Sequence, residues 1–183
     1  MLIFRFILCT CLIAVTSLQA QLKPLEVAKV RMDSENEMIL LGKINRANLT
    51  TDPIFNKWFE EEYNFYKLPN GWAEAMKGLG KEVSITLFMG TWCADTQMGL
   101  GGIFKVLDAL QIPDERIEMF ALSEYKDSPQ RFEEGLDIYN VPTVIFSKNG
   151  KELNRMVEFP VESWHADTEK ILKGLPYKHS YFE

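Results

Sequence analysis

Gly90-Thr91-Trp92-Cys93-Ala94-Asp95-Thr96 is the most informative stretch of this 183-residue chain. It follows the almost unbroken apolar run 83–89, which is typical of a strand buried on both faces of a sheet. It also opens a predicted helix over residues 94–110, so Cys93 stands in the turn between a strand and a helix. A second stretch, Val141-Pro142-Thr143, leads into a later apolar strand. Together the two stretches make Cys93 the centre of the functional question.

The chain after residue 80 reads as strands alternating with helices. The Asn-Gly pair within the turn 148–151 is the strongest short hairpin signal, so the strands around it are expected to pair antiparallel. The strands on either side of helix 94–110 form a strand-helix-strand unit, which implies parallel pairing with a right-handed crossover. The predicted strands cover residues 83–89, 117–122, 143–146 and 152–157, and the predicted helices cover 94–110, 132–139 and 161–173.

The first twenty residues read as a signal peptide. A positive charge precedes the apolar run 6–15, and Ala20 offers a small residue for cleavage. A run this short cannot cross a bilayer, which needs about 20 apolar residues. We therefore predict a signal peptide over 1–20 and export of the protein, either to a periplasm or out of the cell. A lipoprotein signal through Cys9 or Cys11 is a minor alternative, because small residues do not lead into either cysteine.

Composition narrows the classes of partner. The chain has a formal net charge of −6, and removal of residues 1–20 takes away one positive side chain, Arg5. An acidic chain of this kind argues against nucleic acid and against an anionic membrane surface as partners. Two of the three cysteines leave with the signal peptide, so the mature chain keeps only Cys93 and has no internal disulfide.

Residues 21–50 are interpreted as an N-terminal extension, in which 38–41 could form a short strand. Residues 51–183 are interpreted as one domain that begins with two helices. Asp52-Pro53 starts the first helix, with a capping side chain followed by proline, and a shorter helix follows over 72–79. The aromatic side chains of the first helix recur at helical spacing and are interpreted as core packing rather than a ligand site: Phe55, Trp58, Phe59, Phe65 and Tyr66.

The Trp92-Cys93 pair after a buried strand, the Val141-Pro142-Thr143 step and the hairpin after it resemble the thioredoxin superfamily over residues 81–175. The resemblance implies a thioredoxin-like α/β fold, which is a three-layer sandwich with a central mixed β-sheet, carrying here an N-terminal helical extension. The variant Trp-Cys-x-Asp-Thr resembles a branch of exported bacterial members whose second cysteine is commonly replaced. The second cysteine position of the family motif holds Thr96 here.

The resemblance also implies a substrate groove beside Cys93. Trp92 matches the family tryptophan that shields the cysteine, and Pro142 matches the family's cis-proline. The residue before that proline, here Val141, offers backbone groups to an extended substrate peptide. Trp92, Val141 and Pro142 are therefore the expected substrate-binding residues. Leu87 departs from the family, because an acidic residue that serves the second step of the reaction often stands at that position.

Cys93 and Thr96 are the expected catalytic residues. Unpaired backbone N–H groups at a helix start favour an anion and so favour the thiolate, the attacking species in thiol–disulfide exchange. Thr96 lies one turn further on, where its hydroxyl can hydrogen-bond the sulfur but cannot attack a mixed disulfide. Asp95 opposes thiolate formation, and we interpret it as a carboxylate that stabilises the first helical turn.

Gly99, Gly101 and Gly102 crowd the early part of the same helix. Each glycine costs about 0.5–1 kcal/mol relative to alanine in a helix interior. Flexibility and close packing are both open explanations for the three glycines.

Three functions from different classes fit these residues. The first is a monothiol protein that exchanges disulfides with protein or small-molecule thiols through mixed disulfides. The second is a redox-inactive binding module that uses the groove beside Pro142. The third and weakest is a thiol peroxidase in which Cys93 becomes a sulfenic acid, because no arginine lies in the motif to polarise a peroxide. We expect no cofactor or metal, since His165 and His179 form no metal-ligand pattern with Cys93 and are interpreted as surface residues.

Overall fold

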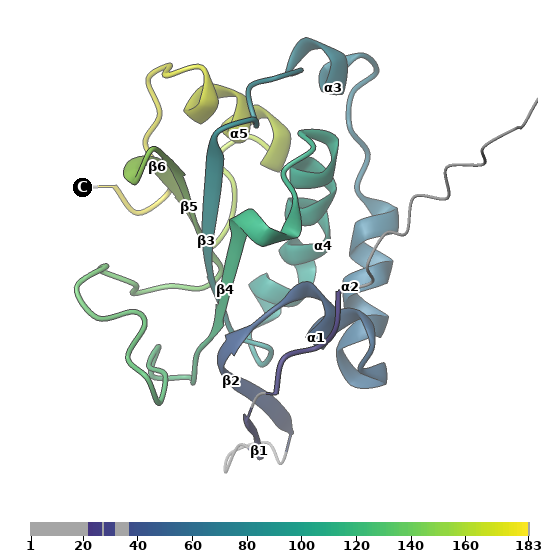
Figure 1. Cartoon of the computed structure of the whole chain (residues 1–183), viewed down its shortest axis with the longest axis vertical. Coiled ribbons are helices and arrows are strands. Elements are labelled where there is room, and N and C mark those ends of the chain that lie inside the picture. The colour runs from purple at the N-terminus through teal and green to yellow at the C-terminus, as the bar shows by residue number, and fades with distance from the viewer. Residues whose placement is uncertain (1–21, 27, 32–36, 183) are drawn as a thin grey trace, which may run out of the picture.

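The computed structural model describes residues 22–26, 28–31 and 37–182 (Figure 1), and the signal peptide predicted over 1–20 lies outside these residues. The strands are β1 (Ala28–Arg31), β2 (Met38–Ile44), β3 (Val83–Met89), β4 (Ile117–Ala121), β5 (Thr143–Lys148) and β6 (Lys151–Val157). The helices are α1 (Arg46–Thr50), α2 (Pro53–Phe65), α3 (Trp72–Ala75), α4 (Ala94–Ala109) and α5 (Trp164–Leu172), with a 3₁₀ turn over Asp114–Arg116.

One six-stranded mixed sheet runs through the described residues in the order β1-β2-β4-β3-β5-β6. β3 and β4 pair in parallel on either side of the crossover helix α4, and the other pairings are antiparallel. The predicted parallel pair and the predicted hairpin of β5 and β6 are therefore confirmed, as is the mixed α/β class. β1 and β2 come from the N-terminal extension, so part of that extension belongs to the same sheet as the strand before Cys93.

The two faces of the sheet are covered in different ways. α2, α4 and α5 pack on one face, where side chains such as Leu87 and Val144 join the larger hydrophobic cluster (Figure 1). The alternate positions, Phe88 and Ile145 among them, point to the other face and join a smaller cluster that contains Cys93. Cys93 therefore belongs to the packing of the second face.

The helix predicted over 132–139 is wrong, because residues 122–142 form an irregular segment with turns that covers the second face. Phe132 and Leu136, which are spaced like residues on one face of a helix, still pack on the smaller cluster. Their spacing reflects burial in an irregular segment. Arg131 has a φ of 56° and Asp137 a φ of 55°, which are left-handed conformations that an α-helix does not contain. The layer expected on this face is therefore built from an irregular segment instead of a helix.

Close packing explains the glycines of α4. A Cβ on Gly101 would lie 2.6 Å from the Phe59 carbonyl oxygen and closer still to the Tyr63 amide nitrogen, both in the backbone of α2. A Cβ on Gly102 would lie 2.9 Å from the ring of Trp164. Real Cβ atoms essentially never come within 3.0 Å of such neighbours. The close approach of α2 to α4 therefore requires a glycine at position 101.

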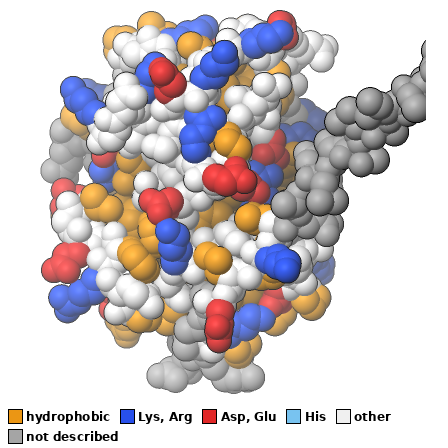
Figure 2. Space-filling model, in the orientation of Figure 1, with side chains coloured by type: hydrophobic (Ala, Val, Ile, Leu, Met, Phe, Trp, Pro, Cys, Tyr) orange, Lys and Arg blue, Asp and Glu red, His pale blue; other side chains and the backbone are white. Residues whose placement is uncertain are grey.

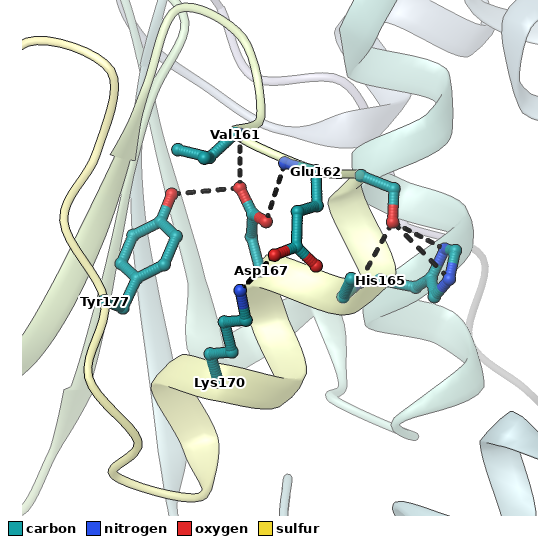
Figure 3. A network of polar contacts seen from close by, with 8 residues as sticks. Val161, Glu162, His165, Asp167, Lys170 and Tyr177 are labelled. Atoms are coloured by element: carbon teal, nitrogen blue, oxygen red, sulfur yellow. Dashed lines mark hydrogen bonds and ion pairs between the residues drawn. The ribbon is translucent and has the colours of Figure 1, made fainter.

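Asp167 of α5 is a fully buried carboxylate that holds the chain in front of its own helix (Figure 3). Its two oxygens accept the backbone N–H of Val161 at 2.6 Å and of Glu162 at 3.1 Å. The hydroxyl of Tyr177 donates to the same carboxylate at 3.1 Å. Asp167 thus fixes the turn that leads into α5, which begins at Trp164 and not at the predicted residue 161.

Charged side chains of both signs are interspersed over the face of the molecule seen in Figure 2, with hydrophobic side chains between them. Acidic and basic groups on this face are not gathered into a patch of one sign. This distribution resembles an ordinary solvated protein surface, on which opposite charges lie close to one another.

Tyr63 is expected to make stability depend on alkaline pH. Its hydroxyl donates to Asp108 at 2.8 Å, and burial together with that carboxylate raises the pKa of Tyr63 to about 12. The folded-state pKa lies above the ordinary value of 10.0. The stabilisation is therefore fully present below pH 10.0 and is lost as the pH rises through about 12. We expect Tyr63→Phe to cost about 1 kcal/mol at neutral pH, after allowance for solvent screening, and to flatten the alkaline loss of stability. Urea unfolding at neutral and alkaline pH measures this, and equal pH slopes for the two proteins would contradict it.

Candidate functional site

Cys93 is the N-cap residue of α4 and follows β3 after a short turn. Its carbonyl accepts the Gln97 N–H at 3.0 Å, and its own N–H donates to the Gly90 carbonyl at 3.0 Å. Its sulfur makes no capping hydrogen bond to the helix. The predicted helix start is therefore confirmed, and the thiol is directed to another segment of the chain.

That other segment is the Val141-Pro142 pair, which directly precedes β5. The Cys93 thiol donates a hydrogen bond to the Val141 carbonyl oxygen, with 3.2 Å between sulfur and oxygen, and the Val141–Pro142 peptide bond is cis as predicted. Residues 48 positions apart in sequence thus meet, as the two sequence stretches imply. Only the protonated thiol can donate this bond, so formation of the thiolate removes it.

Cys93 is largely buried, with 8% of its surface exposed. It lines a hollow of about 250 Å³ whose walls include Trp92, Asp95, Asn140 and Glu158. A hollow of this size has room for a small reagent, and Cys93 is one of the residues that line it.

Trp92 forms a fixed wall of this hollow. Its indole N–H donates to the Leu122 carbonyl at 2.9 Å, and the Lys126 ammonium lies 5.3 Å from the centre of its ring. A Cβ on Gly90 would lie 2.5 Å from the indole nitrogen, so the turn before Cys93 needs a glycine to admit the ring. These contacts hold the ring in one orientation beside the thiol.

Thr96 does not have the orientation we expected. Its side chain is fully buried, and its hydroxyl accepts the Gly90 N–H at 3.4 Å. Among the described residues, no hydrogen bond joins the Thr96 hydroxyl to the Cys93 sulfur. Thr96 therefore supports the turn from β3 into α4 in this structure, because the unpaired backbone N–H of residue 90 attracts the hydroxyl.

Two carboxylates, Asp95 and Glu158, and one ammonium, Lys126, line the same hollow as Cys93. Burial raises the pKa of Glu158, the charge of Asp95 raises it further, and the Lys126 ammonium acts in the opposite direction. The hydroxyl of Tyr181, from the C-terminal tail, donates to Glu158 Oε2. The hollow therefore combines both signs of charge and has no uniform field that selects an anionic or a cationic ligand.

Sequence reasoning missed Lys126, Asn140 and Glu158 as walls of the hollow. Lys126 has a φ of 62° and Glu158 a φ of 65°, so both stand at bends of irregular backbone. Neither the 3.6-residue nor the 2-residue period of apolar side chains continues through such bends. Only the position of Asn140, directly before Val141-Pro142, gives a signal in the sequence.

The histidines lie outside the Cys93 hollow. His165 is partly exposed, and its Nδ1 shares hydrogen bonds with the hydroxyls of Tyr66 at 2.8 Å and Ser163 at 3.2 Å. Among the described residues, no group of three or more His, Cys, Asp or Glu side chains is placed to hold a metal ion. Within the same part of the chain, no helix combines the length and the apolar character needed to cross a membrane.

Comparison with known proteins adds weak similarities only. No family model and no curated protein matches the chain. Among solved structures, it is similar to a protein of unknown function from Pseudomonas aeruginosa, with 18% sequence identity and a TM-score of 0.44 over 72% of this chain and 81% of that one. It is also similar to an HIV epitope-scaffold, with 21% identity and a TM-score of 0.43 over 73% of this chain and 84% of that one. At these scores neither similarity carries an argument about function.

Proposed function

We propose that the protein is a thioredoxin-like protein of monothiol type, which exchanges disulfides through Cys93 in an exported compartment. The contact between the Cys93 thiol and the Val141 carbonyl, beside the cis peptide bond to Pro142, is the observation that carries this proposal. The parallel pair β3–β4 and the antiparallel hairpin β5–β6 support the thioredoxin-like assignment. Export rests on the signal peptide predicted over 1–20. The test is the mass of the mature protein isolated from the native host, which should equal that of a chain beginning at Gln21.

The reaction is an exchange with a disulfide of a protein or a small molecule. The Cys93 thiol loses its proton to water and leaves the Val141 carbonyl. The thiolate attacks one sulfur of the partner disulfide, a new S–S bond to Cys93 forms, and the old S–S bond breaks. The departing sulfur keeps the electron pair and takes up a proton, so the number of disulfides is unchanged.

Thr96 determines the lifetime of the mixed disulfide formed in this first step. A second cysteine at that position would attack the mixed disulfide from one helical turn away, but a hydroxyl does not. Release of the partner therefore needs an external thiol. This makes the mixed disulfide long-lived and defines the monothiol character of the proposed function.

A redox-inactive binding module is the second candidate, and one observation favours it. Cys93 is 8% exposed and its proton is engaged by Val141, which is how a retained, inert cysteine would be held. In such a module the hollow beside Pro142 would bind a partner without covalent chemistry. Reactivity of the folded protein distinguishes the two functions.

The test is adduct formation with oxidised glutathione, followed by intact-mass spectrometry. We expect one adduct on the folded mature protein, none on Cys93→Ser, and complete reversal by dithiothreitol. The adduct should persist after the free disulfide is removed, because Thr96 cannot release it. The variant Thr96→Cys should shorten its lifetime.

Absence of the adduct on a protein with native circular dichroism would overturn the monothiol proposal in favour of the binding module. A sulfenic acid that forms rapidly with hydrogen peroxide, without any reaction with disulfides, would instead favour a thiol peroxidase.

A further inference from the structure

A second and larger hollow, of about 690 Å³, lies next to the Cys93 hollow. Its walls come from the segment before Pro142, from β6 and from the C-terminal tail. They include Tyr139, Asn140, Arg155, Val157, His179 and Tyr181.

The two hollows are neighbours, because they share one wall residue and a hydrogen bond joins a wall residue of each. Asn140 lines both of them and directly precedes Val141, whose carbonyl faces the Cys93 sulfur. Tyr181 lines the larger hollow, and its hydroxyl donates to Glu158, which lines the smaller one. A chain that places a sulfur on Cys93 and runs past Asn140 therefore leads into the larger hollow.

The charged groups of the larger hollow are already paired within the protein. The Arg155 guanidinium donates two hydrogen bonds of 2.7 Å to the Glu152 carboxylate and a third of 2.7 Å to the Leu136 carbonyl. Asp137 accepts the hydroxyl of Tyr139 at 3.2 Å. An anionic ligand would have to compete with Glu152 for the Arg155 guanidinium, so this cation is not free to select one.

What remains free is aromatic and apolar surface. The side chain of Tyr139 is 76% exposed and that of Tyr181 is 47% exposed, and both hydroxyls are directed to carboxylates. Burial and the nearby Arg155 lower the pKa of His179, so its imidazole is neutral at neutral pH. The rings of Tyr139 and Tyr181 are therefore the surfaces that a ligand would cover.

We propose that the larger hollow receives a large aromatic side chain of the same extended peptide whose cysteine forms the mixed disulfide with Cys93. This inference rests on the proposed function and adds a substrate class, namely cysteine-containing peptides with an aromatic residue near the cysteine. In an extended chain each residue spans about 3.3 Å, so the aromatic residue lies a few positions from the cysteine.

The test uses short peptides whose single cysteine carries a 2-thiopyridyl disulfide, because the released thiopyridone reports each reaction by its absorbance. Tryptophan replaces alanine at each of three positions on either side of the cysteine. Every rate is divided by the rate of the same protein with 2,2′-dithiodipyridine, which has no peptide part. We expect tryptophan at one position to raise this normalised rate about tenfold over alanine, as burial of an aromatic side chain allows.

Tyr139→Ala should reduce the tryptophan preference to about twofold, because it removes one aromatic wall. Phe65→Ala is the matched control. Phe65, which the sequence pattern wrongly assigns to the core, is also 76% exposed but lies at the end of α2, so this variant should leave the preference unchanged. If the protein reacts with 2,2′-dithiodipyridine but shows no preference, or keeps it in Tyr139→Ala, only this inference is overturned. If it does not react with 2,2′-dithiodipyridine at all, the proposed function and the inference both fail.

Discussion

Gly101→Ala is expected to lower the free energy of unfolding by about 3 kcal/mol, the upper part of the range for overpacked cores. The added Cβ would meet the backbone of α2, 2.6 Å from the Phe59 carbonyl oxygen, and a backbone cannot rotate away as a side chain can. α2 would have to move off α4, and the larger hydrophobic cluster between them would loosen. Urea unfolding followed by tryptophan fluorescence measures the loss.

Gly102→Ala provides the graded control for this prediction. Its Cβ would meet the side chains of Trp164 at 2.9 Å and Tyr66 at 3.0 Å, which can shift, so a smaller loss is expected. Helix propensity alone predicts the opposite sign, a gain of up to about 1 kcal/mol for glycine to alanine. Gain of stability in Gly101→Ala would therefore contradict the close crossing of the two helices.

Asp167→Ala is expected to cost about 3 kcal/mol, because three donors lose their acceptor at once. These donors are the backbone N–H groups of Val161 and Glu162 and the hydroxyl of Tyr177 (Figure 3). Asp167→Asn should cost less, since the amide keeps one acceptor oxygen in the same place. The free energy of unfolding of each variant, from urea titration, gives the order of the two losses.

Tyr177→Phe is the matched control, because it removes a single donor and leaves the carboxylate paired with the backbone. Its cost should be about 1 kcal/mol, the value of one hydrogen bond. If Asp167→Ala is no more destabilising than Tyr177→Phe, the backbone bonds in front of α5 contribute little and the prediction is wrong.

The helices and strands around Cys93 could be predicted because their apolar side chains follow regular periods. The run 83–89 is buried along most of its length, and Asp52-Pro53 caps α2 as predicted. Residues 122–142 could not be predicted, because their apolar side chains are spaced like those of a helix while Arg131 and Asp137 have left-handed backbone. Such conformations in residues other than glycine leave little trace in a sequence.

Part of the candidate site could be predicted from a sequence motif, and part of it could not. Cys93, Val141 and Pro142 were placed together by their resemblance to a known motif, and the structure brings the Cys93 thiol to Val141. The orientation of Thr96 was not predictable, because a hydroxyl at that position has both the sulfur and a backbone N–H within one helical turn. Glu158 reaches the hollow from the bend after β6, which no periodic pattern marks.

The two hydrophobic clusters on opposite faces of the sheet have a consequence for local opening. Helices cover one face and satisfy their own backbone hydrogen bonds, whereas turns and loops in 122–142 cover the face that holds Cys93. Proteins open in cooperative units, and segments with few regular backbone bonds open at a lower free energy than the helical core. We therefore expect residues 122–142 to exchange their amide hydrogens, and to admit more solvent to Cys93, while α2 and α4 stay closed. On this expectation, the local stability of residues 122–142 sets how far the thiol is shielded from reagents, and it can differ from the global stability of the protein.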